Sequence, residues 1–130
     1  MDYQIPEEFA QLVRLTERFV ATELRPHEPE VERDDRVPDA LRRRLRAKAL
    51  ELGLFAFNMP AEAGGPGLPY LAQVLIREQL GKVSVALADL VGRPPKALLA
   101  CTSEQRGRFL LPTVRAQKTW AVGLTEPRAG

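Results

Sequence analysis

Apolar residues recur along the first part of the chain at the three- and four-residue spacing of an amphipathic helix. We expect this helix to begin near Pro6, because proline suits the first helical position, and to end before Pro26. Its apolar positions are Phe9, Leu12, Val13, Phe19, Val20 and Leu24. The charged stretch 26–38 that follows is predicted to be a solvated connection between helices.

Three further helices are predicted in the middle of the chain. The first covers 38–52, and Gly53 is placed to end it in the left-handed conformation. The segment 54–69, a short apolar run followed by a Gly/Pro loop, leads to a second helix over 70–81. The third, 83–91, is apolar on nearly every side, which is typical of a central helix that others cover.

The pattern after the Gly92–Pro95 break predicts one more helix. Thr102 and Gln105 have the spacing of a capping box, which indicates a helix over 103–111 with Phe109 as one of its inward residues. Leu110 is the other expected inward residue. Proline at position 112 is predicted to end or kink this helix.

The final apolar run has the length and composition of a buried strand. We expect this strand over 120–124, ended by the turn that contains Pro127. A short helical turn is predicted over 97–100. The predicted fold class is therefore all-α: a bundle of five to six helices followed by one strand.

Charge and composition argue against several functional classes. The 130 residues carry 19 Lys and Arg against 17 Asp and Glu, and a net charge of +2 gives no electrostatic argument for nucleic-acid binding. The arginine run 42–46 is predicted to be solvated helix surface, because Arg44 and Arg46 are not expected to share a face with Arg42 and Arg43. No apolar stretch approaches about 18 residues, so no membrane span is predicted.

The titratable residues point to a cytoplasmic protein without a metal site. Cys101 is the single cysteine, which rules out an internal disulfide and fits a reducing compartment. The N-terminal residues lack the features of a signal peptide. His27 has no cysteine or other histidine at ligand spacing, so no metal ligand is assigned.

Three segments of the chain resemble the acyl-CoA dehydrogenase family, in the order and at about the spacing of that family. Thr125–Gly130 resembles its threonine-glutamate-proline-glycine-alanine-glycine signature. Met59–Leu68 resembles its proline-x-glutamate-x-glycine-glycine loop, and Thr102–Pro112 resembles its threonine-glutamate-glutamate-glutamine helix. The resemblance implies an N-terminal helical domain over 1–117 and the first strand of a truncated middle β-domain over 118–130.

The same resemblance implies a function for a few residues. The threonine hydroxyl of the signature and nearby backbone N–H groups would donate to FAD, in an enzyme that desaturates an acyl-CoA thioester. The expected cofactor-binding residues are Val122, Leu124 and Thr125, and the expected wall of the acyl pocket is Leu87, Leu90, Leu98 and Leu99. In this family the catalytic base comes from a C-terminal helical domain, so no residue of this sequence is assigned that role.

Other implications concern partners. The intact enzyme would pass electrons to an electron-transfer flavoprotein and form a homo-oligomer, whereas this chain alone would be inactive and would bind FAD weakly or not at all. Arg128 departs from the signature by replacing a glycine. The alternative is a stand-alone or decayed helical module that binds a partner without catalysis.

Overall fold

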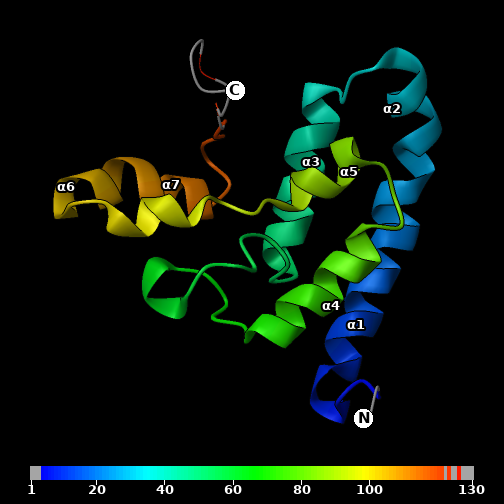
Figure 1. Ribbon diagram of the computed structural model, residues 1–130. Helices are drawn as coiled ribbons and strands as arrows, with labels where there is room; N and C mark the ends of the chain where they lie inside the picture. Colours follow the sequence, from blue (N-terminus) through cyan, green and yellow to red (C-terminus); the bar gives the residue numbers. More distant parts are fainter. Residues whose placement is uncertain (1–3, 122, 124–125, 127–130) are drawn as a thin grey trace.

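The computed structural model describes residues 4–121, 123 and 126, and its helices confirm the predicted all-α class (Figure 1). The α-helices are α1 (Glu7–Phe19), α2 (Glu28–Asp34), α3 (Asp39–Glu51), α4 (Tyr70–Leu80), α5 (Val85–Ala88), α6 (Ser103–Gln105) and α7 (Leu111–Val114). Within the described part, Trp120, Ala121 and Gly123 have no regular secondary structure and Glu126 forms an isolated β-bridge. The other positions of the predicted strand lie outside the described residues.

The first helical run is longer than the sequence predicts. The prediction that Pro26 ends it, and that 26–38 is a solvated connection, is wrong: a π-helical turn over Val20–Leu24 and a 3₁₀ turn over Arg25–His27 lead directly into α2. Proline stands at the start of the 3₁₀ turn and again at the start of α2, where a missing N–H breaks no helical hydrogen bond. Val31 of α2 is buried, so this segment belongs to the core.

Helix α3 ends at Gly53 in the left-handed conformation, as predicted, and its last turn forms a Schellman motif. Gly53 has φ +69°, its N–H donates to the Leu50 carbonyl (3.1 Å), and the Leu54 N–H donates to the Ala49 carbonyl (2.8 Å). This turn reverses the chain and directs the apolar run 54–59 into the core, where all six of its residues are buried.

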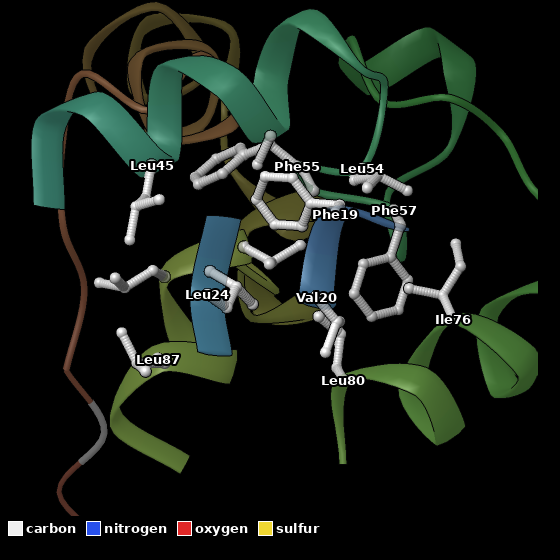
Figure 2. Close-up of a cluster of buried hydrophobic side chains, with 14 of the residues drawn as sticks. Phe19, Val20, Leu24, Leu45, Leu54, Phe55, Phe57, Ile76, Leu80 and Leu87 are labelled. Carbon is white, nitrogen blue, oxygen red and sulfur yellow. The ribbon is translucent and has the colours of Figure 1, made fainter. Parts of the chain in front are cut away.

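The core lies where α1, its π-helical turn, α3, α4 and the 54–59 run meet. Figure 2 shows Phe19, Val20 and Leu24 pointing toward side chains that follow much later in the sequence. The most deeply buried large side chains are Leu24, Leu45, Leu54, Met59, Ile76, Leu87 and Leu110. At about 25 cal/mol per Å² of apolar surface removed from water, this cluster is the main source of stability.

Helices α4 and α5 are both partly exposed, and for α5 this contradicts the prediction. Helix α5 ends after four residues in a 3₁₀ turn over Asp89–Val91, and Val85 at its start is 75% exposed, so it is not a central helix covered on all sides. On α4, Ile76 is buried but Tyr70 and Val74 are exposed. Helix α1 packs beside α4 (Figure 1), and the exposed Tyr70, Leu71 and Val74 mark the side of α4 that the described residues leave open.

The last helical run extends from α6 through a π-helical turn, Arg106–Leu110, to α7, and it lies to one side of the bundle (Figure 1). Pro112 does not end it. The carbonyl of Arg108, four residues earlier, cannot receive a bond from proline and instead accepts from the Lys118 ammonium (2.7 Å). Leu110 is buried as predicted, but Phe109 is 40% exposed, with Arg108 and Lys118 each within 5.4 Å of its ring centroid.

The predicted capping box is confirmed at the start of α6. The Gln105 N–H donates to the Thr102 hydroxyl (3.4 Å), and the Thr102 N–H donates to Gln105 Oε1 (3.0 Å). We expect Thr102→Ala to lower the free energy of unfolding by about 1 kcal/mol, because a helix-end N–H loses its partner. Urea denaturation measures this change. Thr102→Ser, which keeps the hydroxyl, serves as the control and should stay within about 0.5 kcal/mol of the wild type.

Candidate functional site

The candidate site is built around the Gly92–Pro95 break, which two hydrogen bonds hold against the buried 54–59 run. The Ala56 N–H donates to the Gly92 carbonyl (2.9 Å), and Asn58 Nδ2 donates to the Pro94 carbonyl (2.8 Å). Because that carbonyl only accepts, the orientation of the Asn58 amide is settled, and its buried Oδ1 has no partner among the described residues. The helix break is thus a fixed part of the structure and shapes the surface beside it.

Two neighbouring cavities, of about 310 and 390 Å³, flank this break. Both are bordered by Phe57, Arg77 and Arg93. The smaller lies between the end of α4 and α5, and its apolar walls are Leu80, Val83, Val85 and Ala88. The larger lies beside the open side of α4, and its walls include Tyr70, Val74, Pro94, Pro95 and Trp120.

The chemistry of these cavities is that of an apolar surface with a positively charged border. Arg77, Arg93 and Lys96 supply the cations, and among the described lining residues Asp89 is the only carboxylate. Such walls suit a ligand that combines an apolar part with a negative charge. Among the described lining residues, no nucleophile stands beside a base.

The four residues expected to form the acyl pocket differ in how deeply they are buried. Leu87 and Leu90 are buried in the core, and neither borders the two cavities. Leu98 and Leu99, in the 3₁₀ turn Lys96–Ala100, are partly buried against the core. Their assignment to an acyl pocket stays a prediction.

The expected FAD-binding residues, Val122, Leu124 and Thr125, lie outside the described residues. The chain leading to them is described as far as Trp120 and Ala121. Trp120 is half-buried, packs against the core and borders the larger cavity together with Arg93 and Pro94. The segment that leads to the signature therefore adjoins the candidate site.

Two of the resemblance segments lie against each other in space. The Arg106 guanidinium, in the capping-box helix, donates to the Glu62 carbonyl of the Gly/Pro loop (3.1 Å). A Cβ atom placed on Gly64 of that loop would lie 3.7 Å from Val114 Cγ1 of α7. The loop and the last helical run thus pack together, although 40 residues or so of chain separate them.

The arginine run on α3 is divided differently from the prediction. Arg42, Arg43 and Arg46 border one hollow together with Arg115, so the expectation that Arg46 faces away from the first two is wrong. Offsets of three and four residues place these side chains on one helix face. Arg44 faces elsewhere and bonds to Glu23 (2.9 Å) and to His27 Nε2 (2.9 Å).

Sequence reasoning missed Phe57, Arg77 and Arg93 as residues of the site. Phe57 reads as one more core residue of an apolar run, and the helix periodicity marks Arg77 only as solvated. The one signal in the sequence that could have indicated the site was Arg93, because it is a charged residue in a Gly/Pro loop and loops often carry functional residues.

Two further features of the described residues concern metal ions and membranes. In the described ranges, no group of three or more His, Cys, Asp or Glu side chains is placed to hold a metal ion. None of the helices described is both long and apolar enough to cross a membrane.

Comparison with known proteins decides the family. The sequence model described as "Acyl-CoA dehydrogenase, N-terminal domain" matches residues 6–117. The chain belongs to the acyl-CoA dehydrogenase family. Within this family it corresponds to the N-terminal domain, as the resemblance of the three segments predicted.

Similar proteins of the acyl-CoA dehydrogenase family include both reductases and dehydrogenases. The 3-(aryl)acrylate reductase of Clostridium sporogenes is 32% identical over 95% of this chain and 33% of its own length. The acryloyl-CoA reductase (NADH) of Anaerotignum propionicum is 29% identical over 100% of this chain and 33% of its own. The mitochondrial short-chain specific acyl-CoA dehydrogenase of Sus scrofa is 27% identical over 98% of this chain and 31% of its own length. This chain spans about a third of the length of these relatives, and no solved structure matches it.

Proposed function

We propose that this N-terminal domain belongs to a FAD-dependent enzyme that introduces an α,β double bond into an acyl-CoA thioester. The family match over residues 6–117 carries the proposal. The domain's contribution is one wall of the acyl site. Its candidate surface, apolar beside α4 and α5 and bordered by Arg77 and Arg93, suits an acyl group attached to an anionic carrier.

FAD fits this chain only in part. The cavities that border Trp120 measure about 390 and 270 Å³. Small-molecule sites span roughly 300–1,000 Å³, and both cavities lie at or below the lower end of this range, so we expect residues beyond the described ones to enclose most of a dinucleotide. When bound, FAD would supply the hydride acceptor that this desaturation requires. The proposed role of Val122, Leu124 and Thr125 is to hold the flavin edge through backbone and hydroxyl donors.

A second candidate function is the reverse reaction, reduction of an α,β-unsaturated substrate. The observation that favours it is that two of the similar proteins are named as reductases, of 3-(aryl)acrylate and of acryloyl-CoA. Both directions add or remove hydrogen across the same carbon–carbon bond, so one site geometry serves either. The direction then depends on the electron partner and not on the walls that this domain supplies.

Several finer assignments belong to the same proposal. The domain boundary is placed after residue 117, with 118–130 as the start of the middle β-domain. An electron-transfer flavoprotein is the proposed electron acceptor; one similar protein, from Acetobacterium woodii, is named as a subunit of a reductase-Etf complex. A homo-oligomer is proposed for the intact enzyme, and the cytoplasm is proposed because the single cysteine fits a reducing compartment.

The test uses the whole open reading frame that contains this chain. The expected result is a yellow protein with about one FAD per subunit, bleached by one or more acyl-CoA thioesters in the absence of oxygen. Bleaching by acyl-CoA supports dehydrogenation; oxidation of the reduced enzyme by an enoyl or acrylate substrate supports reduction. A colourless protein that gains no flavin absorbance on incubation with FAD would contradict both proposed functions.

The 130-residue chain alone should fail to retain FAD, because the described residues form only one wall of a dinucleotide site. Absorbance at the flavin wavelengths after desalting measures this, with the whole open reading frame as the positive control. Flavin retained by the isolated chain at a near-stoichiometric ratio would contradict the prediction.

The non-catalytic module remains the alternative, and the exposed side of α4 is the observation that favours it. Tyr70, Leu71 and Val74 present apolar surface there, with exposures of 73, 47 and 43%. If this surface binds partners, the chain should self-associate as its concentration rises. Sedimentation at several concentrations tests this, and a monodisperse monomer counts against the alternative.

A further inference from the structure

Four arginines border a hollow of about 210 Å³ on the side of α3 where the chain leaves α7. Arg42, Arg43 and Arg46 come from α3, and Arg115 directly follows α7. The floor is apolar and consists of Ala47, Leu50 and Ala116. The described residues that line it include no Asp or Glu. The hollow is separate from the two cavities beside the Gly92–Pro95 break.

Three of these four charges are not compensated by the described part of the chain. Arg42 is paired, through hydrogen bonds to Asp39 (2.9 Å) and to the Val37 carbonyl (3.3 Å). The side chains of Arg43, Arg46 and Arg115 form neither an ion pair nor a hydrogen bond with described residues. Arg44, on the same helix, shows the contrast, since its side chain has two polar partners.

Arg46 is the most informative of the three. Its Nε is buried and has no hydrogen-bond partner among the described residues. Burial, and then the charge of Arg42, lower the pKa of its guanidinium. Asp89 lies on another side of Arg46, at the border of a second cavity, and forms no ion pair with it. A buried donor beside like charges is unfavourable unless an acceptor of negative charge completes it.

We propose that this hollow binds the phosphoryl group of an organic phosphate. A carboxylate brings one negative charge, which leaves the remaining guanidinium groups unneutralised. A phosphate monoester brings about 1.5 to 2 charges and three acceptor oxygens, which match several planar guanidinium donors at once. The apolar floor contacts the organic part of such a ligand, and Leu50, 43% exposed, leaves room for it. The proposal does not depend on the acyl-CoA chemistry.

Isothermal titration calorimetry on the purified protein at low salt tests the proposal, with three soluble probes: inorganic phosphate, pyrophosphate and ADP. We expect saturable binding that weakens as salt is added, because exposed charges are screened. Arg46→Gln and Arg115→Gln should each weaken binding about tenfold or more, the effect of losing one charge-assisted hydrogen bond. The matched control is Arg44→Gln, on the same helix but bonded to Glu23, which should bind as the wild type does.

A second binding experiment, with lipid vesicles, identifies the source of the phosphoryl group. Binding to the soluble probes assigns it to a soluble phosphate ester, whereas binding only to vesicles that contain phosphatidic acid, whose headgroup is a phosphate monoester, assigns it to a lipid headgroup, and both outcomes keep the site. Three results overturn it: no binding in either arm, equal losses in Arg44→Gln and Arg46→Gln, or succinate binding as tightly as pyrophosphate. Flavin content of the whole protein is measured separately, so failure here leaves the proposed function standing.

Discussion

Leu24→Ala is expected to lower the free energy of unfolding by about 2–5 kcal/mol. Leu24 is fully buried, and it lies in the π-helical turn between α1 and α2. In Figure 2 it points into the space between Leu45 of α3 and Leu87 of α5. Truncation removes apolar contacts with both helices and leaves a cavity that the packed surroundings fill only in part.

The measurement for Leu24→Ala is urea denaturation followed by far-ultraviolet circular dichroism. The midpoint should fall while the slope stays unchanged, as for a pure loss of stability. The control is Leu71→Ala on α4, the same substitution at a side chain that is 47% exposed, and it should cost less than about 1 kcal/mol. Equal losses in the two variants would mean that Leu24 is not part of the core.

Gly92→Ala is the second large effect, and we expect it to lower the free energy of unfolding by about 2–6 kcal/mol. The backbone of Gly92 has φ +76° and ψ +119°, a conformation that costs an L-residue about 1–3 kcal/mol. A Cβ atom there would also overlap the ring of Phe55, which is 98% buried and cannot swing away. Overpacking of this kind adds about 1–3 kcal/mol.

Gly53→Ala separates these two costs. Gly53 has φ +69°, but nothing lies within 4 Å of a Cβ placed on it, so only the backbone strain of about 1–2 kcal/mol is expected. Urea denaturation of both variants measures the difference. A loss in Gly92→Ala no larger than in Gly53→Ala would show that the Phe55 ring yields at little cost.

The backbone shift that Gly92→Ala causes should also disturb the candidate site. Its carbonyl accepts from the Ala56 N–H, and the Pro94 carbonyl two residues later accepts from Asn58. Both bonds hold the surface that borders the two cavities. In the whole protein, Gly92→Ala is therefore expected to lower the affinity for the proposed acyl-CoA ligand as well as the stability.

Much of the helical layout follows from local signals along the chain. The capping box at Thr102 and the left-handed glycine at position 53 are predicted from the sequence and confirmed, because each depends on residues within one turn. The three resemblance segments likewise depend on the order of residue types, and the family match agrees with them. On α3, Leu45 and Ala49 lie four residues apart and are both buried, as the helical repeat requires for one face.

Other features were decided by tertiary structure. Proline at 26 ends a helix or starts a new turn equally well in local terms, and the burial of Val31 against the core selects the second. Phe109 reads as an inward residue, but the π-helical turn rotates it outward while Leu110 remains buried. Whether an apolar side chain lies inside depends on what packs over it, which no local pattern specifies.

The candidate site shows the same division. The sequence by itself determined that a Gly/Pro break follows α5, that arginines gather on α3 and that the chain carries the family's motifs. Only the tertiary structure decided that Arg93 and Phe57 border the same cavities, and that Arg115 joins Arg46 around one hollow. The physical reason is range: helix signals act over three or four residues, whereas these pairs are brought together by the packing of the core.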